Sequence, residues 1–424
     1  MASREDRQRI DVLPEDEHQV MLKEAIESPT IWSALMWGGR VAVDLVGATT
    51  ETDTLRKLRH SSQLGTRVGL NRGNRGEKQE ELKGWRLFED AEFPTSSLRY
   101  LDAIHGKFKV AEEDEDLQVH AGHPIDLELF KNPQLLIKLG WRREEGRFQS
   151  RIVKSNDGRG VVCSQSYLTV RLRGDGTDRS DDIWATFNSA FATAYLFLTS
   201  GRFAAERAQP SPQDFLDVPL ADLLPGEKPD TLAAIDRAVA RALHLTESER
   251  ALVKDICDVI LPDFKGDETS LGRQRTDRQS SAGNDEPQLK SYCKSLTARL
   301  CEIYGEDKAL SATILQEQKG RWPLRVVAIH LGTGEPDNSP YIERSDSESL
   351  HSQLQGLANT LGYDDWRPKL LAGRTARIFT EIRRGKEVVP SVYFLKPDQI
   401  RHWTRTAARH DADAIVGDLW ALAH

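Results

Sequence analysis

The stretch from Asp181 to Ser200 reads DDIWATFNSAFATAYLFLTS and predicts an apolar helix. Phe187, Phe191 and Tyr195 recur every four residues, so in a helix they lie on one face and pack together. The Asn188-Ser189 pair interrupts the apolar run, and we expect its side chains to hold neighbouring loops by hydrogen bonds. This segment therefore predicts a scaffold helix that closes an N-terminal domain.

The residues that precede this helix predict a mixed domain over 1–225. A helix is expected near its start, followed by short β-like runs at 40–46 (RVAVDLV), 67–78 (RVGLNRGNRGEK) and 158–172 (GRGVVCSQSYLTVRL). The longer stretch 151–174 has the pattern of a hairpin whose tip could enter a DNA groove. A proline-rich segment then leads out of the domain.

The remainder predicts three further segments. Residues 226–261 have apolar positions at helical spacing and form a helical connector, in which Thr246 and Glu249 fit a capping box. Residues 262–288 are polar and predict a mobile linker. Residues 289–424 predict a small α+β domain with a helix over 289–305, a strand over 323–332, a hairpin around Arg384 and a final helix that starts near Pro397. The expected fold class is α+β throughout.

Composition sets limits on the class of protein. The net charge of −8 is acidic, which is unusual for a nucleic-acid binder. The charge is uneven, however: residues 55–86 carry nine Lys/Arg against three acids, 138–179 carry ten against five, and 366–409 carry eleven against three. Because salt screens charges beyond about 10 Å, a locally basic face can still bind phosphates.

The sequence contains no run of 18 apolar residues and its charged N-terminus lacks an apolar signal core, so we expect no membrane association and a cytoplasmic location. The four cysteines form no CxxC pair and predict reduced thiols, with neither a zinc site nor another metal site (Cys163, Cys257, Cys293, Cys301).

Motifs of common enzymes are missing. There is no Walker-type phosphate loop, GxSxG elbow or HExxH helix. Asn338–Tyr341 (NSPY) is a degenerate version of the loop with which amino-methyltransferases grip a flipped base, and a surface turn explains it better. His105, Lys107 and Glu112 only partly match a phospholipase-D-like nuclease motif. Asp411 and Asp413 lack a third metal ligand and predict a solvated helix end. We therefore expect no catalytic residues.

Three groups of residues are candidates for DNA contact. The glycine-rich segment after a predicted strand lets the backbone approach a phosphate or base edge, and it carries the first group. Basic turns on either side of the predicted hairpin carry the second. The third group recurs every four residues in the expected C-terminal helix, where Ile400, Trp403 and Ala407 would form the buried face and the arginines one basic stripe. The groups are Arg67, Asn71, Arg72, Arg75 and Lys78; Arg142, Arg143, Lys154 and Arg159; and Arg401, Arg405 and Arg409.

The first 225 residues resemble the target-recognition domains of type I restriction specificity subunits and of fused restriction–methylation enzymes. The resemblance rests on the glycine-rich segment 67–76, the proline before an apolar strand in 130–138, and the helix 183–198 that leads through Ser200-Gly201-Arg202 to 212–220. It implies a non-catalytic subunit that reads duplex DNA. No methyltransferase domain precedes the region and only one recognition domain is evident.

The resemblance thus implies a separate DNA methyltransferase subunit that would hold S-adenosylmethionine, with no cofactor in this chain. We expect this subunit to bind through the helices around 183–258. Nuclease or ATPase subunits and a homodimer would fit the same interpretation, in a restriction or phage-defence complex. Two alternatives stay open: a DNA methyltransferase or nuclease with degenerate motifs, which would bind S-adenosylmethionine or cleave DNA alone, and a protein–protein adaptor without DNA contact.

Overall fold

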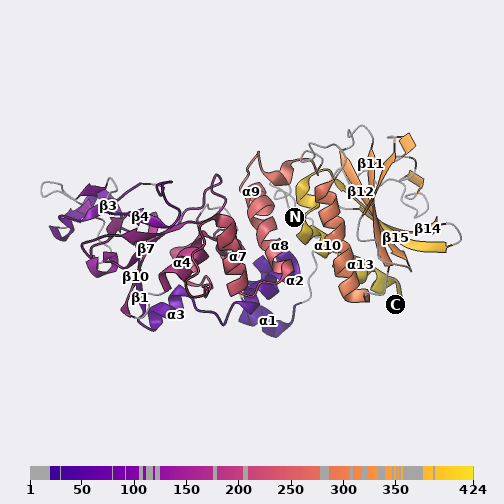
Figure 1. Cartoon of the computed structure of the whole chain (residues 1–424). Helices are drawn as coiled ribbons and strands as arrows, with labels where there is room; N and C mark the ends of the chain where they lie inside the picture. Colours follow the sequence, from indigo (N-terminus) through magenta and orange to yellow (C-terminus); the bar gives the residue numbers. More distant parts are fainter. Residues whose placement is uncertain are drawn as a thin grey trace. The chain divides into compact units, whose positions relative to one another are not determined.

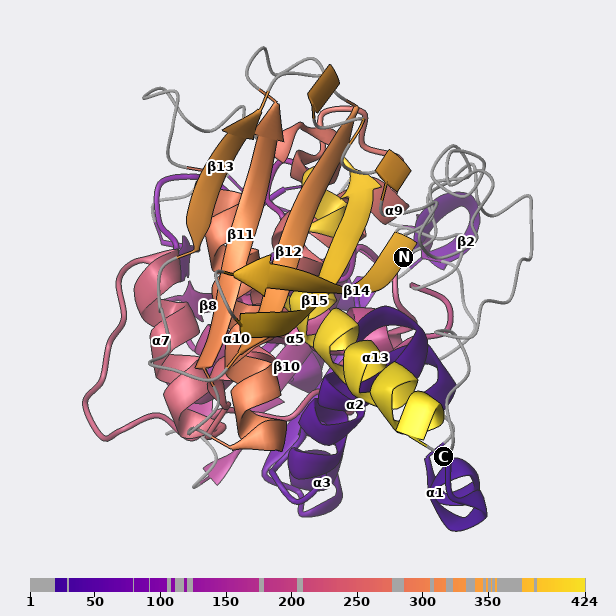
Figure 2. The ribbon, with the colours of Figure 1, turned by 90° about the vertical axis from the view of Figure 1, so that its right-hand side faces the viewer.

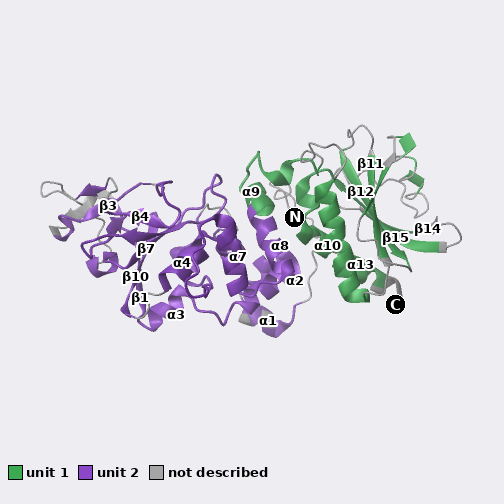
Figure 3. Ribbon diagram, viewed as in Figure 1, with its two compact units in different colours: residues 1–18, 258–424 green, residues 19–257 purple. Residues whose placement is uncertain are grey.

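The computed structural model describes most of the chain, and the described residues form helices and several small sheets, which confirms the α+β class. The described residues are 20–28, 30–78, 80–90, 92–104, 108–110, 118–119, 125–174, 179–203, 209–276, 286–305, 309–317, 323–332, 340–345, 348–349, 352, 355–356, 376–384 and 387–423. The chain divides into two compact units (Figures 1 and 3). Unit 2 is Gln19–Cys257 and unit 1 contains Asp258–His424.

A five-stranded sheet with the order β1-β10-β7-β8-β4 forms the centre of unit 2. All strand pairs are antiparallel except β4 with β8. Its strands are β1 (Leu64–Val68), β10 (Tyr167–Leu172), β7 (Gln134–Lys138), β8 (Ser150–Lys154) and β4 (Tyr100–Asp102). Two smaller sheets accompany it: β5-β3-β9, made of Lys109–Val110, Arg86–Phe88 and Val161–Cys163, and β2-β6, made of Arg72–Lys78 and Gln118–Val119.

The two faces of the central sheet pack against different partners. Leu136 and Tyr167 join one apolar cluster with Phe88 of β3 and Val161 of β9. On the opposite face the Ser150 hydroxyl donates to the Trp184 carbonyl of a helix, at 3.1 Å. Because successive strand residues alternate between faces, β7 is buried along its whole length.

The expected hairpin over 151–174 is wrong. Strand β7 lies between β8 and β10, and β9 pairs with β3 instead. The side chain of Gln134 completes the arrangement, because its amide accepts from the Val161 N–H and donates to the Val161 carbonyl, both at 2.9 Å. The buried Gln134 side chain thus forms hydrogen bonds with β9 of the kind that a neighbouring strand would form.

The helices of unit 2 are α1 (Leu22–Glu27), α2 (Ile31–Ala48), α3 (Leu55–His60), α4 (Ser180–Asn188), α5 (Ala190–Thr199), α6 (Pro212–Leu216), α7 (Leu232–Ala242) and α8 (Glu247–Asp255). Short 3-10 turns occur at Glu80–Leu82 (η3) and Leu127–Phe130 (η4), and a π-helix, η6 (Ile256–Ile260), follows α8. The strand expected at 40–46 is wrong, because these residues belong to α2. Ala42, Leu45 and Val46 are buried at helical spacing, so packing overrides the β propensity of the valines.

Two helices of the expected connector, α7 and α8, belong to unit 2, where α7 contacts α4 and α8 contacts α2 and α5. The capping box of Thr246 and Glu249 is confirmed at the start of α8. Gly38 permits the close approach of α2 to α8, since a Cβ atom there would lie 2.8 Å from the Leu252 Cδ1 atom. The boundary between the units therefore falls after Cys257 rather than at residue 225.

Unit 1 contains a five-stranded sheet with the order β13-β11-β12-β15-β14, seen face-on in Figure 2. Its strands are β13 (Tyr341–Ser345), β11 (Ala309–Glu317), β12 (Leu324–Gly332), β15 (Glu387–Pro397) and β14 (Ala376–Arg384), and α10 (Pro287–Tyr304) and α13 (Arg405–Ala423) pack against it. The hairpin around Arg384 is confirmed, since β14 and β15 pair antiparallel up to Arg384 and Glu387. The helix over 289–305 and the strand over 323–332 are confirmed as well.

Residues 262–276 are part of unit 1, whereas a mobile linker was expected there. They include all but the first residue of α9 (Leu261–Phe264) and the 3-10 turn η7 (Leu271–Arg273). The buried carboxylate of Asp398 anchors them, because it accepts from Thr276 N–H and Oγ1, at 3.1 and 2.7 Å. A polar segment can thus be ordered when a buried acid satisfies its donors. Residues 277–285 of the expected linker lie outside the described residues.

Buried charges connect the sheet of unit 1 to its helices. The Lys396 ammonium bonds to the Asp411 carboxylate, which also accepts from the Tyr292 hydroxyl at 2.6 Å. Arg325 on β12 bonds in the same way to Glu286, next to α10. Because both pairs are almost fully buried, removing one partner would leave a charge without compensation.

Candidate nucleic-acid interface

The loop between β8 and β9 carries Lys154 and Arg159, two of the predicted DNA-binding residues. The Gly158 backbone has a φ of +71°, a conformation that glycine adopts without steric cost. At Gly160 a Cβ atom would lie 2.4 Å from the Phe130 carbonyl oxygen, so the chain passes close to residues 130–132. The loop therefore has a defined turn at its tip and a tight attachment at its end.

Asp157 organises this loop from within. Its carboxylate accepts from the Ser155 hydroxyl at 2.5 Å, from the Arg159 N–H at 3.1 Å and from the Arg86 guanidinium at 3.0 Å. The Ser155 hydrogen bond, with the contributions of Arg86 and the Arg159 N–H, lowers the pKa of Asp157 to about 2. The carboxylate is therefore ionised at neutral pH and acts as an acceptor that orders the basic loop.

Two cations of the loop lie over aromatic rings. The Lys154 ammonium is 3.6 Å from the centroid of the Tyr100 ring, and the Arg159 guanidinium carbon is 5.6 Å from the centroid of the Trp85 ring. Both basic side chains remain exposed. An aromatic platform limits the number of positions that a long side chain occupies, so less conformational entropy is lost when it meets a phosphate.

An open pocket of about 450 Å³ adjoins Lys154. Its polar lining comes from Asn132, Ser155 and Asn156, which present neutral groups. The remaining lining consists of the apolar residues Ile104, Pro133 and Val153 and of Lys154 itself. The site therefore combines exposed cations with a neutral, partly apolar pocket.

The basic turn at Arg142 and Arg143 lies at the other end of the sheet. Since β7 runs from Gln134 to Lys138 and β8 returns antiparallel, the turn between them is at the end opposite to the β8–β9 loop. Arg142 forms an ion pair with Glu92, and Arg143 is exposed. The structure thus separates the second group of candidates into two surfaces.

The glycine-rich group is only partly visible. Arg67 is half-buried near the end of β1, an edge strand of the central sheet, and pairs with Thr169 of β10. Asn71 is exposed, beyond a bridge between Leu70 and Ser164. The backbone of β2 carries the other three candidates, Arg72, Arg75 and Lys78, whose side chains lie outside the described part of the structure.

The arginines of the C-terminal segment do not form the expected stripe. The helix starts at Arg405 instead of Pro397, which ends β15, and Arg401 lies in the 3-10 turn η9 (Ile400–His402). Arg401 binds Asp263 at 3.1 Å and Arg409 binds Glu302 at 3.0 Å. Ile400 and Trp403 are buried as expected, whereas Ala407 is only half-buried.

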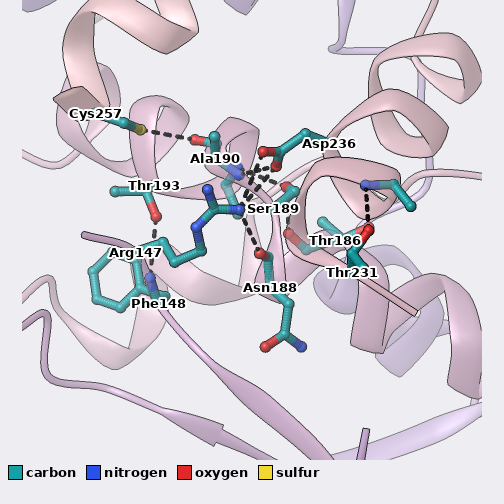
Figure 4. Close-up of polar contacts among 12 residues, drawn as sticks. Arg147, Phe148, Thr186, Asn188, Ser189, Ala190, Thr193, Thr231, Asp236 and Cys257 are labelled. Carbon is teal, nitrogen blue, oxygen red and sulfur yellow. Dashed lines mark hydrogen bonds and ion pairs between the residues drawn. The ribbon is translucent and has the colours of Figure 1, made fainter. Parts of the chain in front are cut away.

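The Asn188-Ser189 pair is a scaffold element, as expected, but it divides the predicted helix in two (Figure 4). Ser189 is extended (φ −84°, ψ 156°) and caps α5 by accepting from the Ala192 N–H. Asp236 of α7 accepts from the Ala190 N–H at 2.8 Å and from Arg147 at 3.0 Å. Because residues 182–198 are buried throughout, α4 and α5 cannot offer the docking face that was expected of the helices around 183–258.

The cysteines and the acidic residues of the C-terminal helix were also considered in the sequence. All four cysteines are described and none forms a disulfide, and burial raises the pKa of Cys163 and Cys293 to about 12. Asp411 is buried and bound to Lys396, so the expectation of a solvated position is wrong for it, whereas Asp413 is exposed and pairs with Arg299 at 2.8 Å. Within the described ranges no cluster of three or more His, Cys, Asp or Glu side chains could hold a metal ion. No helix in the same ranges is long and apolar enough to cross a membrane.

Most residues of the degenerate enzyme motifs lie in parts of the chain that the structure does not describe. His105, Lys107 and Glu112 lie outside the described residues, as do Asn338 and Ser339. Tyr341 is the first residue of β13 and is exposed.

Sequence reasoning missed the partners that build the site. Asn132, Asn156 and Asp157 were not proposed, and neither were the rings of Tyr100 and Trp85. The run Asn156-Asp157-Gly158 is a turn signature and could have located the loop tip. The aromatic rings come from β4 and from the residue before β3, and no sequence spacing relates them to the loop.

No protein-family model matches the chain, and no curated protein matches it. The function is therefore inferred from the residues described above.

Proposed function

We propose that this chain is a non-catalytic DNA-recognition subunit that binds duplex DNA through the β8–β9 loop. The observation that carries the proposal is the pairing of Lys154 with Tyr100 and of Arg159 with Trp85 on either side of a loop ordered by Asp157. Exposed cations that are held in position can neutralise phosphates of the DNA backbone. The adjoining pocket has neutral hydrogen-bonding groups, which suit contacts to bases rather than to phosphates.

The acidic net charge is compatible with this role because the acid within the loop is already engaged. Asp157 is bound to Arg86 and Ser155, so it contributes order rather than a free negative charge. Phosphate attraction acts over about one Debye length, and the distant acids of the chain are screened at physiological salt.

The test is a measurement of duplex binding by fluorescence anisotropy between about 50 and 200 mM salt. Lys154→Ala with Arg159→Ala should weaken binding and reduce the slope of log K against log salt by about one for each phosphate that is no longer neutralised. Arg241→Ala is the matched control, since Arg241 is exposed and pairs with Glu227 on another surface of unit 2. Equal salt slopes for the wild type and the double variant would refute the interface.

We further propose that a separate DNA methyltransferase subunit, which carries S-adenosylmethionine, supplies the chemistry of a restriction or phage-defence complex in the cytoplasm. Nuclease or ATPase subunits could join the same complex. Co-purification of a methyltransferase whose sequence preference requires this chain would support that assignment. Binding of S-adenosylmethionine, or DNA cleavage, by the isolated chain would contradict it.

A protein–protein adaptor is the second candidate, and one observation favours it. Five large apolar side chains are exposed within α1, the first half of α2 and the residue before α1: Met21, Leu22, Ile26, Trp32 and Met36. Exposed apolar side chains gathered on neighbouring segments often mark a protein-binding surface. An adaptor would form a salt-insensitive complex that Trp32→Glu with Met36→Glu abolishes, and it would retain no DNA.

A further inference from the structure

The pocket beside Lys154 has the chemistry of a base-reading site rather than of a phosphate site. Its polar groups are the side-chain amides of Asn132 and Asn156 and the hydroxyl of Ser155, all neutral. An amide offers a donor and an acceptor side by side, which matches a base edge, whereas a phosphate offers acceptors only. The one cation of the lining, Lys154, has its ammonium over the Tyr100 ring.

The Asn132 amide is incompletely satisfied. Its Oδ1 atom is buried and has no hydrogen-bond partner among the residues that the structure describes. A buried acceptor without a donor carries a free-energy cost and calls for an explanation. A small rotation of the amide toward the pocket would present this oxygen and the adjacent Nδ2 group to a ligand, so a ligand with a matching donor and acceptor would relieve the cost.

The walls of the pocket are held in place by three segments of unit 2. The Asn132 N–H donates to the Gly158 carbonyl at 3.0 Å, which ties the asparagine to the β8–β9 loop. The Ile104 N–H donates to the Asp102 carboxylate at 2.8 Å, and Val153 is buried in β8. A pre-organised pocket loses little entropy on binding and can discriminate between similar ligands.

We infer that this pocket reads an A·T base pair in the major groove, with Asn132 contacting the adenine. Adenine presents the N6 donor and the N7 acceptor, the pattern that an asparagine amide pairs with in a bidentate manner. The apolar wall of Ile104, Pro133 and Val153 suits the 5-methyl group of the paired thymine. This inference depends on the proposed binding of duplex DNA and adds the identity of the base pair that is read.

The experiment is a selection from a pool of randomised DNA duplexes with the full-length wild type, with Asn132→Ala and with Gln213→Ala as control. Gln213 has an exposed side-chain amide on α6, which carries none of the candidate DNA contacts. The wild type and Gln213→Ala should enrich the same sequence. Asn132→Ala should lose its preference at a single A·T position, by roughly 10-fold to 100-fold, and keep its salt slope. An unchanged salt slope also shows that the variant is folded.

Modified bases in the enriched sequence test the same contact without a variant. Replacing the adenine by 7-deazaadenine should weaken wild-type binding about as much as Asn132→Ala does, and it should not weaken the variant further. The inference would be overturned if Asn132→Ala lost its preference at a G·C position. It would also be overturned if Asn132→Ala kept all its preferences and wild-type binding were insensitive to 7-deazaadenine at every position. Neither result would contradict the proposed binding of DNA. If the wild type enriches no sequence, the proposed function and this inference both fail.

Discussion

The Asn188 side chain should be among the most costly polar groups to remove from unit 2. It is almost fully buried and connects α4 to the edge of β8. The Ile152 N–H donates to the Arg99 carbonyl next to β4, at 2.9 Å. Ser150, two residues earlier, donates its N–H to Asn188 Oδ1 at 3.3 Å instead. The amide thus continues the hydrogen-bond ladder beyond the start of β4.

The expected loss can be worked out bond by bond for Asn188→Ala. The Trp184 carbonyl keeps the Ser150 hydroxyl as donor, and the Ser150 carbonyl keeps Arg151. Among the described residues the Ser150 N–H keeps no partner, which costs about 1–3 kcal/mol in a buried site. Losing the two shortest Nδ2 bonds, at 2.7 and 2.8 Å, adds about 1 kcal/mol each. We therefore expect a free energy of unfolding that is lower by about 3–5 kcal/mol.

Amide hydrogen exchange followed by mass spectrometry measures this loss locally, in peptides that cover β8 and α4. Peptides of unit 1 serve as the internal reference, and Asn71→Ala is the control for an exposed asparagine. Asn188→Asp preserves the volume but turns an oxygen toward the carbonyls of Trp184 and Ser150, so it should be at least as destabilising at pH 7. A loss below about 1 kcal/mol in both variants would refute the reasoning.

Three further predictions concern titration and buried charge. Burial raises the pKa of Asp182 to about 6, above its value of about 3.9 in an unfolded chain, so its contribution to stability is present below about pH 4 and lost as the pH rises through 6. Asp182→Asn should therefore gain roughly 3 kcal/mol relative to the wild type between about pH 4 and pH 7 in denaturant unfolding, and a pH-independent difference would contradict this. Iodoacetamide at about pH 8 should modify half-buried Cys301 well before Cys163 and Cys293, whose pKa is about 12. The order of modification is measured by peptide mass mapping, and earlier modification of Cys163 or Cys293 would contradict their burial. Asp411→Ala removes the carboxylate that faces the buried lysine of unit 1 and should cost about 3–5 kcal/mol there, whereas unchanged hydrogen exchange in α13 would show that the lysine finds another partner.

Local patterns predicted the elements that depend on a few neighbouring residues. The helix over 289–305 follows from apolar spacing, the capping box from Thr246 and Glu249, and the β14–β15 hairpin from two alternating runs around a glycine turn. Such features are encoded within one or two turns of chain, and their hydrogen bonds close over short separations. For the same reason the aromatic positions of 187–195 correctly predicted a buried helical scaffold.

The candidate site could be predicted only in part for the opposite reason. Lys154 and Arg159 were found because charge is visible in the sequence, but their partners Tyr100 and Trp85 are more than fifty residues away along the chain. The pocket likewise joins Ile104, Asn132 and Asn156 from three separate segments. No local pattern encodes that proximity.

By itself the sequence determined the α+β class, the local helices and hairpin, and the uneven distribution of charge, since each depends on composition or on short-range periodicity. Only the tertiary structure decided that β7 separates β8 from β10, that α2 replaces an expected strand, and that residues 262–276 are ordered by Asp398. In each case the deciding contact joins residues that are distant in sequence. The free energy of burying an apolar face or satisfying a buried carboxylate then exceeds the local preference of the chain.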